Sequence, residues 1–500
     1  MVTDIQRSMT RGTAWMMLFK LVERSLGFVS TLILVRLLSP ADFGIVAMAI
    51  SFIAMAELLS AFGFDLALIH KQDATESHYH TAWTCNVLFG LVITAVMIAF
   101  AQPIATFYNR PDVFWVVCIL AVGPSIGGLE NIGVVAFRKD LNFRKEFVFL
   151  ISKKLTGVLV TVPLAFWLHS YWALVAGMLT SRICGTTISY LVHPFRPRLS
   201  LASIGELMHF SKWIFVNNVV IFFKERTTDF VVGGLKGPTA LGLYNVSSEF
   251  SNLPLTELAA PMNRALLPAY AKIQDDRDGI RTAFRNTIGI LALIAIPAAI
   301  GICAIAPLLV PVILGANWLK ARPLIEVLSL SGGVVLFHSP ICSLLIASGR
   351  PDAVAKCHAV FVGVLIGGLF LLVPNRSEMG AAYATLAAAV FATPAYLWHL
   401  RKHVGVGPTL FLGAIARPML ASVAMLLVLR LALPVADTLA GAGWQALFLI
   451  FGIVLGAVVY AVVISATWVV VGRPSGAEQI ALKQLRRALT RVRTRFGNSA

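Results

Sequence analysis

The sequence predicts an all-α polytopic membrane protein with about 14 transmembrane helices. Of its 500 residues, 58% are hydrophobic and only 13% are charged, whereas charged residues make up about 25% of an ordinary soluble protein. The mean hydropathy is +0.81, and apolar runs of about 20 residues, the length that crosses a bilayer as a helix, recur along the chain. Such runs are too long for barrel strands, so we expect helices rather than a β-barrel.

The first half of the chain is predicted to form an N-terminal lobe of six helices over residues 1–193. Its first apolar run is expected to be retained as a membrane span, because it lacks a small-residue cleavage site typical of a signal peptide. A tight link, Leu38-Ser39-Pro40-Ala41-Asp42-Phe43-Gly44, follows that run. The six spans are expected at about residues 14–35, 43–64, 81–101, 113–136, 147–168 and 172–192.

A polar segment at 194–209 is interpreted as the cytoplasmic link to a C-terminal lobe at 210–403. Two nearly uncharged runs at 404–472 are predicted to be spans 13 and 14. The tail at 473–500 spaces its apolar residues three and four apart among Lys and Arg, which favours a basic amphipathic helix on the cytoplasmic leaflet over a frayed soluble tail. The spans after the link are expected at about residues 213–235, 241–270, 287–314, 324–347, 353–373, 380–400, 410–433 and 445–471.

An internal repeat relates the two lobes. When the chain is shifted by 198 residues, Pro40 meets Pro238 and Gly44 meets Gly242. Each pair follows the first helix of a block of six, and six is even, so the blocks are expected to be parallel repeats about an axis along the membrane normal. The first and seventh helices are then equivalent, and each carries a Lys, a Glu and an Arg.

The charge distribution predicts the topology and the partners. Lys and Arg concentrate in alternate short loops and in the tail, so the positive-inside rule places both termini in the cytoplasm. The net charge of +17 would suggest nucleic acid in a soluble protein. Here we expect no nucleic acid, but anionic inner-leaflet lipids and an anionic substrate. The extracytoplasmic loops are too short for a folded catalytic domain.

The motif content argues against an enzyme. The chain has no Walker A loop, no Gly-x-Ser-x-Gly and no His-Glu-x-x-His. Its six cysteines include no Cys-x-x-Cys, so neither a disulfide framework nor a zinc site is expected. His70, His78 and His80 are interpreted as residues of a solvated loop. We predict no catalytic residue, no metal and no cofactor, and we leave coupling to protons or sodium ions open.

The most informative residues are charges inside apolar runs. The seventh run contains Lys224-Glu225-Arg226-Thr227-Thr228-Asp229, and the first contains Lys20, Glu23 and Arg24. A charge at the bilayer centre costs roughly 2.5–3.5 kcal/mol on insertion scales, so such residues usually face a cavity or a partner. Two interpretations remain open: these side chains line a polar pathway, or they only pair with one another and fasten helices.

Cations are as frequent as acids among these buried charges, which suits a phosphate or pyrophosphate ligand. Lys153, Lys154 and Arg182 have a second interpretation, in which they extend to the membrane interface. The candidate substrate-binding residues are Lys20, Arg24, Lys224, Arg226 and Arg264. The candidate coupling or cation-orienting residues are Glu23, Glu57, Glu225, Asp229 and Glu249.

An ordered set of motifs resembles the polysaccharide transporter family of Wzx-type oligosaccharide flippases, within the multidrug/oligosaccharidyl-lipid/polysaccharide exporter superfamily. The set comprises the Leu38–Gly44 link, Phe137-Arg-Lys-Asp-Leu-Asn-Phe-Arg-Lys, Leu267-Pro-Ala-Tyr-Ala-Lys-Ile-Gln-Asp-Asp, Gly315-Ala-Asn-Trp-Leu and Ser348-Gly-Arg-Pro-Asp. The resemblance implies two six-helix lobes around a central cavity that opens alternately to each side, with the last two helices shaping a lipid groove. It also implies that Arg24 and Arg226 are equivalent by position to the cavity arginines of related lipid II flippases.

The resemblance further implies the function. The chain is expected to move a polyprenyl-pyrophosphate-linked oligosaccharide from the cytoplasmic to the outer face of the bacterial inner membrane. The product would serve exopolysaccharide, lipopolysaccharide or capsule biosynthesis, with a polymerase and co-polymerase as partners. The alternative within the superfamily is a cation-coupled multidrug exporter, which the cation-rich runs argue against. A glycan polymerase or ligase is a third hypothesis, which the short extracytoplasmic loops argue against.

Overall fold

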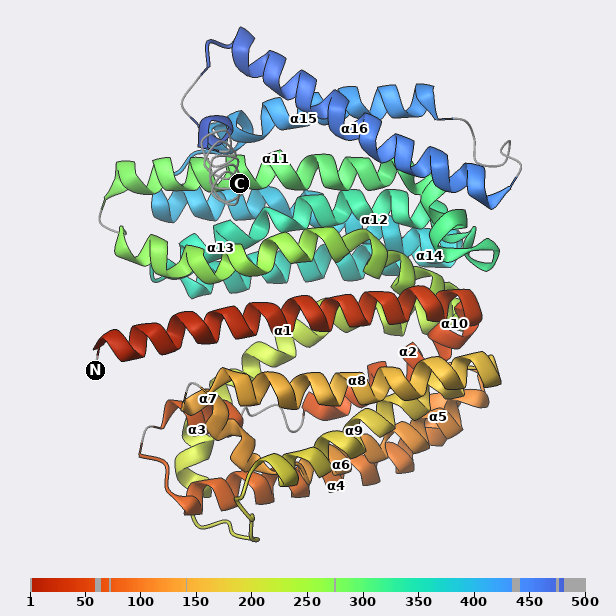
Figure 1. Ribbon diagram of the computed structural model, residues 1–500, viewed down its shortest axis with the longest axis vertical. Coiled ribbons are helices and arrows are strands. Elements are labelled where there is room, and N and C mark those ends of the chain that lie inside the picture. Colours follow the sequence, from red (N-terminus) through yellow and green to blue (C-terminus); the bar gives the residue numbers. More distant parts are fainter. Residues whose placement is uncertain are drawn as a thin grey trace, which may run out of the picture. The chain divides into compact units, whose positions relative to one another are not determined.

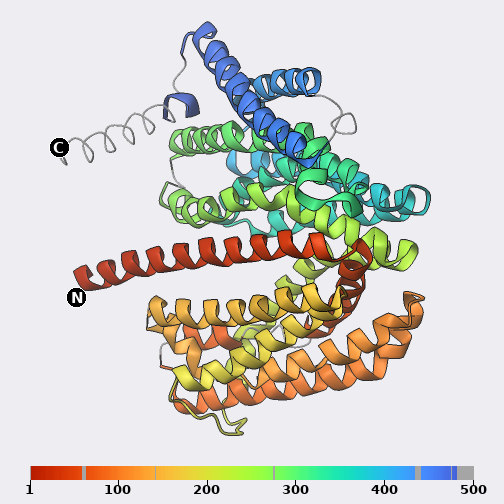
Figure 2. The same ribbon diagram turned by 45° about the vertical axis from the view of Figure 1, so that its right-hand side comes forward.

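The computed structural model describes residues 2–58, 64–71, 73–140, 142–273, 276–433, 441–473 and 476–480. Over these residues the chain is helical, with turns and short extended links and no β-strand, which confirms the predicted all-α class. The chain divides into two compact units, residues 1–242 (unit 1) and 243–500 (unit 2). Figures 1 and 2 show that each unit consists of long helices lying side by side.

Unit 1 begins with two helices that meet at the predicted link, α1 (Val2–Leu37) and α2 (Pro40–Glu57). Ser39 caps α2: its hydroxyl accepts a hydrogen bond from the Asp42 N–H, and the Asp42 carboxylate accepts one from the Ser39 N–H at 2.9 Å. This capping box, with Pro40 at the first helical position, ends one helix and starts the next. Asp42 also accepts a hydrogen bond from the Tyr171 N–H at 3.0 Å, which ties the link to a later helix.

Unit 1 also contains a bent span. The chain between Asp112 and Lys139 turns by 68° at residues 129–131. Before the bend, glycine permits close helix contact: a Cβ on Gly128 would lie 2.4 Å from the Asn86 carbonyl oxygen. The elements are α3 (Phe64–His70), α4 (Glu76–Phe107), α5 (Asp112–Leu120), α6 (Val122–Gly128), η2 (Ile132–Val135), α7 (Ala136–Lys139), α8 (Phe143–Leu168) and α9 (Trp172–Val192).

Two helices are too long for one span and are interrupted where links were predicted. α10 (Ile204–Lys272) has 69 residues and leaves helical dihedrals at Gly237, with φ 81°. α14 (Pro351–Val404) has 54 residues and leaves them at Ser377, with φ 51°. A 20-residue helix already spans about 30 Å, so each has the length of two spans. The first half of α10, up to Gly242, belongs to unit 1.

Unit 2 is built around α11 (Arg277–Leu309), which packs against α12, α15 and α16. Ile288, Ala292 and Ala295 are among the buried side chains of α11. The outer helix α16 keeps large apolar side chains exposed along its length. The other elements are η3 (Val310–Leu314), η4 (Ala316–Trp318), α12 (Ala321–Leu336), α13 (His338–Ala347), α15 (Pro408–Ala432) and α16 (Ala442–Val470).

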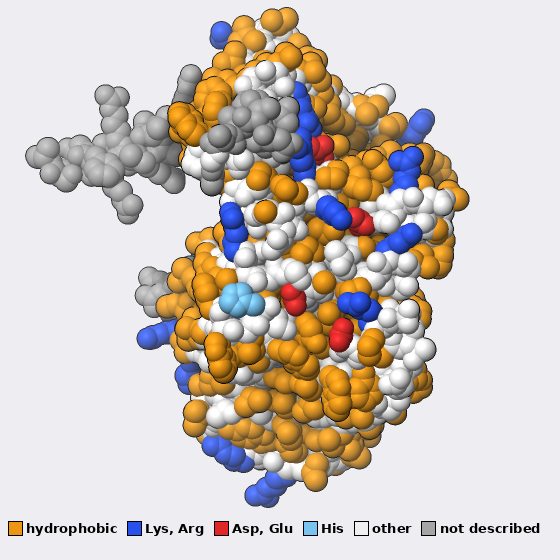
Figure 3. Space-filling view, turned by 90° about the vertical axis from the view of Figure 1, so that its right-hand side faces the viewer, with side chains coloured by type: hydrophobic (Ala, Val, Ile, Leu, Met, Phe, Trp, Pro, Cys, Tyr) orange, Lys and Arg blue, Asp and Glu red, His pale blue; other side chains and the backbone are white. Residues whose placement is uncertain are grey.

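The exterior is that of a membrane protein. Eight of the described helices, or nine if the bent pair counts as one span, are long and apolar enough to cross a membrane. Hydrophobic side chains predominate on the face shown in Figure 3. Among the described residues, the exposed large hydrophobic side chains include Trp167 and Leu431. The count of 14 and the lobes at 1–193 and 210–403 stay predictions. Most of the tail, residues 481–500, lies outside the described residues.

Candidate functional site

The candidate site is centred on an ion pair in the first half of α10. Arg226 Nη1 donates a hydrogen bond to Asp229 Oδ2 at 3.2 Å, one turn along the helix. The two side chains differ in exposure: Asp229 is 5% exposed and Arg226 is 35% exposed. The carboxylate is therefore fixed inside the packing, whereas the guanidinium extends out of it. Such a pair presents a cation whose position is set by a buried acid.

A residue of α2, which sequence reasoning missed, supports this pair. Ser51 Oγ lies 3.2 Å from the same Asp229 Oδ2 and 2.8 Å from the Ala47 carbonyl oxygen, and its one proton can be donated to either acceptor. Next to them, the Phe52 ring lies edge-on to Phe230, with centroids 5.0 Å apart. Ser51 is fully buried. A single serine in an apolar run gives no local signal, because its partner is 178 residues away.

The contact between α2 and α10 continues toward the start of α2. A Cβ on Gly44 would lie 1.8 Å from the Pro238 carbonyl oxygen. A Cβ on Gly242 would lie 1.8 Å from the Pro40 carbonyl oxygen. Pro40 contacts Gly242 and Gly44 contacts Pro238, so residue numbers rise along α2 as they fall along α10, and the two segments run antiparallel. We call residues 40–52 of α2 against 229–242 of α10 the α2–α10 seam. It joins the two proline–glycine pairs that the repeat relates.

The counterpart charges on α1 form a more exposed pair. Lys20 Nζ lies 3.2 Å from Glu23 Oε2, and Arg24 is exposed on the same helix. The rings of Trp15 and Phe19 pack against Phe147 of α8 and fix this part of α1. The structure therefore brings Lys20 and Glu23 together within one turn of α1.

The remaining predicted residues lie at different depths. Lys224 is half-buried and Glu225 is exposed, both beside the Arg226 pair. Glu249 is exposed on the second half of α10, in unit 2. Arg264 lies further along α10, and its side chain is outside the part of the chain that the structure describes.

Glu57 belongs to a second charged cluster, inside unit 1. Its carboxylate lies 3.1 Å from Arg182 Nη2 of α9, and Lys153 of α8 pairs with Glu130 at the bend. Both pairs line a cavity of about 350 Å³. Lys153 and Arg182 therefore each pair with an acid within unit 1, while Lys154 is exposed. The acids neutralise the cations, so this cluster fastens helices.

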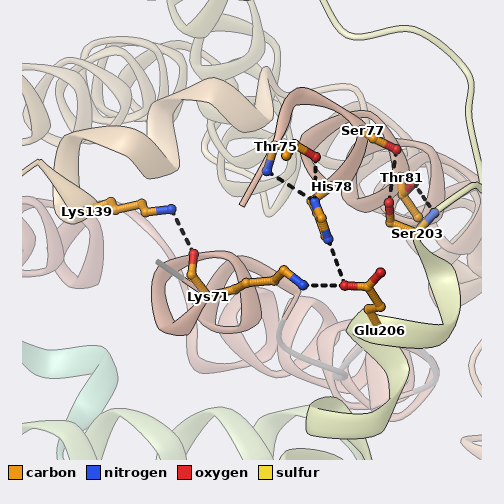
Figure 4. A network of polar contacts seen from close by, with 8 residues as sticks. All are labelled: Lys71, Thr75, Ser77, His78, Thr81, Lys139, Ser203 and Glu206. Atoms are coloured by element: carbon orange, nitrogen blue, oxygen red, sulfur yellow. Dashed lines mark hydrogen bonds and ion pairs between the residues drawn. The ribbon is translucent and has the colours of Figure 1, made fainter. Parts of the chain in front are cut away.

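A third polar network ties the start of α10 to the end of α3 and the start of α4 (Figure 4). The Glu206 carboxylate accepts a hydrogen bond from Lys71 and lies 3.1 Å from His78 Nε2. The hydrogen bond with Glu206 raises the pKa of Lys71. Hydrogen bonds from Lys71 and His78 lower the pKa of Glu206. Lys139 Nζ donates to the Lys71 carbonyl at 2.8 Å and joins α7 to the network.

The prediction of a solvated histidine loop is wrong for two of the three residues. His78 is 6% exposed, because α4 begins at Glu76, and Thr75 Oγ1 holds His78 Nδ1 at 2.8 Å. His80 Nδ1 accepts a hydrogen bond from the Arg198 N–H at 2.9 Å. Arg198 lies 118 residues along the chain from His80, so spacing alone could not reveal that contact. The side chain of His70 is outside the described residues.

Comparison with known sequences gives a consistent result. The family model described as "Polysaccharide biosynthesis protein" matches residues 33–323. The lipopolysaccharide biosynthesis protein WzxC of Escherichia coli K12 is 26% identical over 366 residues, which cover 71% of this chain and 74% of that protein. The succinoglycan biosynthesis transport protein ExoT of Rhizobium meliloti is 25% identical over 479 residues, which cover 92% and 93% of the two chains.

Comparison with solved structures shows the fold. The lipid II flippase MurJ, in an inward closed conformation, matches with a TM-score of 0.74 and 15% identity, over 90% of this chain and 98% of that one. A multidrug resistance transporter of the MATE family, in an inward-facing conformation, matches with a TM-score of 0.61 and 13% identity, over 76% and 94%. These matches confirm the predicted transporter fold.

Proposed function

The chain belongs to the family of polysaccharide biosynthesis proteins, and we propose that it moves a polyprenyl-pyrophosphate-linked oligosaccharide repeat unit across the bacterial inner membrane. It is a multi-pass membrane transporter and not an enzyme. The printed roles of its relatives, lipopolysaccharide biosynthesis and succinoglycan transport, support a glycan cargo. The observation that carries the proposal is the outward-reaching Arg226, held by a buried Asp229 within an apolar helix.

Arg226 has the chemistry that a pyrophosphate requires. A guanidinium carries five N–H donors in a planar fork that matches two phosphate oxygens. The ion pair with Asp229 uses Nη1, so other donors of the same fork can reach a ligand. Asp229 sets the orientation of the side chain in advance, which reduces the entropy lost on binding. In our proposal, Asp229 therefore orients the cation.

The other predicted charges are assigned supporting roles. We propose that Lys20, Arg24, Lys224 and Arg264 attract the pyrophosphate or contact it during passage. Glu23 is proposed to restrain Lys20, its partner at 3.2 Å. Glu225 and Glu249 are exposed acids, and proton or sodium coupling would act through them. Glu57 is proposed to be structural, because it pairs with Arg182.

The direction of transport follows from the proposed topology. With both termini in the cytoplasm, as the positive-inside rule predicts, the repeat unit moves from the cytoplasmic to the outer face. There a polymerase and co-polymerase would receive it for exopolysaccharide, lipopolysaccharide or capsule assembly. Anionic inner-leaflet lipids would contact the basic loops and the tail.

The direct test is to delete the gene and determine on which membrane face the lipid-linked oligosaccharides accumulate. Accumulation on the cytoplasmic face alone is the expected result. Complementation with Arg226→Ala should leave that accumulation in place, whereas Arg226→Lys should restore export in part. Arg281→Ala is a matched control, because Arg281 also pairs with an aspartate three residues away, but on an exposed surface. Full export by the Arg226→Ala variant would remove the pyrophosphate role.

The MATE fold similarity keeps a cation-coupled multidrug exporter as the second candidate. The same deletion strain distinguishes the two candidates. Drug sensitivity with unchanged surface polysaccharide would favour the exporter. Unchanged drug sensitivity with lost polysaccharide would favour the flippase.

A further inference from the structure

Two arginines share one glutamate at the end of unit 2 where α12 begins and α15 ends. Arg322, in the first turn of α12, has its Nε 3.8 Å from Glu326 Oε1. Arg430, in the last turn of α15, has its Nη2 3.4 Å from Glu326 Oε2. Arg430 also donates a hydrogen bond to the Cys303 carbonyl of α11 at 3.5 Å. We call Arg322, Glu326 and Arg430 the α12–α15 cluster.

The ion pairs of this cluster are loose. Charge-assisted hydrogen bonds from nitrogen to a carboxylate are usually about 2.7–2.9 Å long, and both contacts to Glu326 are longer. By contrast, Arg350 makes a fork of two hydrogen bonds to Asp352, at 3.0 and 3.1 Å. The side chains of Arg322 and Arg430 are 32% and 43% exposed. Because a guanidinium has several N–H donors, both arginines keep donors that a further ligand can reach.

The position of the cluster is unusual for cations. In the predicted topology it lies on the outer side, in and beside the loop at 315–323, where the positive-inside rule disfavours Lys and Arg. Lys320 is exposed in the same loop. Lys320 and Arg322 also stand at the start of α12, whose first turn has no acidic residue, so both charges oppose the helix dipole. A bound anion would relieve this repulsion.

An exposed apolar stripe leads away from the cluster along α15. Leu420, Val423, Leu427 and Leu431 are exposed and recur three and four residues apart, so they lie on one face of the helix. The stripe ends beside Arg430. A ligand with an anionic head and a long hydrocarbon chain matches this surface, because its head can reach the guanidinium groups while its chain stays on the apolar face.

We propose that the α12–α15 cluster is a second anion site, which holds the pyrophosphate of the delivered polyprenyl-linked oligosaccharide in the outer leaflet. Two guanidinium forks on separate helices suit the two phosphates of a pyrophosphate better than the single phosphate of a phospholipid. Lys320 attracts the anion as a point charge. The site shares no residue with the Arg226 site, and the identity of its ligand rests on the proposed function.

Equilibrium dialysis with labelled farnesyl pyrophosphate tests the site in full-length protein in phosphatidylcholine nanodiscs. The measurements start from Arg226→Ala, so that binding at the first site does not contribute. This variant should still bind the probe saturably, and adding Arg322→Gln with Arg430→Gln should weaken the binding several-fold. Farnesol, which lacks the anion, should not compete.

Glu326→Gln gives a result of the opposite sign. It removes the charge that competes for both arginines and keeps the shape of the side chain, so it should strengthen binding of the probe several-fold. If the cluster only fastens α12 to α15, the same change would lower the thermal midpoint and leave binding unchanged. That result would overturn the site.

Arg350→Gln with Lys356→Gln is the matched control, because Arg350 and Lys356 also share one acid, Asp352, elsewhere in unit 2. Probe binding should be unchanged in this control. An equal loss of binding would mean that the probe follows net charge, and the site would be overturned.

The wild-type protein and a second lipid distinguish the ways of failing. Binding by the wild type that Arg226→Ala abolishes would overturn the cluster as a site and leave the Arg226 proposal standing. Absence of binding by the wild type would overturn both. Displacement of the probe by phosphatidylglycerol as effective as that by unlabelled farnesyl pyrophosphate would assign the cluster to a phospholipid headgroup and overturn the pyrophosphate assignment.

Discussion

Two ion pairs within unit 1 use the same chemistry and differ in exposure. In the α10 pair, Asp229 is 5% exposed and Arg226 is 35% exposed. In the other pair, Glu57 and Arg182 are 37% and 41% exposed. The two cations are similarly exposed, so the pairs differ in the acid: Asp229 is fixed inside the packing, whereas Glu57 is open to solvent. The difference teaches that a charge inside an apolar run must be judged with its partner.

The two regions also differ in what their glycines contact. Further along the seam from the α10 pair, an added Cβ at Gly44 or Gly242 would meet a backbone carbonyl oxygen of the other helix. Beside the other pair, glycines face the Arg182 side chain: a Cβ on Gly123 would lie 3.6 Å from Arg182 Nε. A long side chain can move, but a carbonyl in a helix cannot. The first region is therefore rigid and the second can adjust.

The largest effect is expected from alanine in the seam. Gly44→Ala and Gly242→Ala should each destabilise the closed seam by about 3 kcal/mol or more, because overpacking there forces the backbones apart. Export and the thermal midpoint in detergent should both fall, and the double variant should be little worse than either single one. Gly123→Ala should be nearly neutral, since its contact distance is ordinary. Equal effects of Gly44→Ala and Gly123→Ala would erase the distinction between the regions.

A smaller effect is expected from removing one acid of each pair. A hydrogen bond to a charged group contributes about 1.5–3 kcal/mol, so Asp229→Ala should reduce export by roughly 10- to 100-fold. Glu57→Ala removes a half-exposed pair, typically about 1 kcal/mol or less, and should mainly lower the thermal midpoint. Export per folded molecule, normalised to membrane abundance, separates the two outcomes. A larger export defect in Glu57→Ala would reverse the assigned roles.

Charge exchange sharpens the comparison further. Exchanging Glu57 and Arg182, by Glu57→Arg with Arg182→Glu, keeps the attraction and should recover the thermal midpoint that either single change loses. Exchanging Arg226 and Asp229 should not recover export, because it buries the cation and presents an acid to the pyrophosphate. A double-mutant cycle for each pair, with export and the thermal midpoint as the two readouts, measures the interaction between its residues. Recovered export in the second exchange would show that only pairing matters there.

The fold was largely predictable because its signals are local. Apolar runs, and links such as Ser39–Asp42 with its capping box, mark helices and their ends within a few residues. The predicted span at 81–101 is shorter than α4, since Thr75 caps the helix and polar residues extend it beyond the apolar run. Boundaries of this kind depend on capping side chains, which hydropathy does not detect.

The site was predictable only in part, because sequence signals are local and several of its contacts join distant residues. Arg226 and Asp229 are three residues apart, so helical spacing places them on the same face. Ser51 and Arg182 find their partners 178 and 125 residues away. A single sequence carries no local signal for such distant pairs. Sequence reasoning therefore found the charged groups but not the distant partners of Ser51 and Arg182.

The smallest effect is expected in the Lys71–Glu206 network, which lies outside the apolar runs. The pKa of Glu206 is lowered from its ordinary value of 4.5, first by the hydrogen bond from Lys71. The network therefore stabilises the fold above pH 4.5 and loses that contribution as the pH falls through the folded pKa. The pKa of Lys71 is raised from 10.5, so at high pH the contribution is lost only above that value.

Thermal midpoints measured across this range test the network against Glu206→Gln, which removes the charge and keeps the shape. The two proteins should differ slightly and constantly between about pH 7.5 and 9, above the range in which histidines such as His78 ordinarily titrate and below that of lysine. The difference should vanish below the folded pKa of Glu206, where the wild-type side chain is also neutral. Glu378→Gln, on α14 of unit 2, is the control that should not shift the profile. A difference that persists at low pH would mean that Glu206 acts by shape and not by charge.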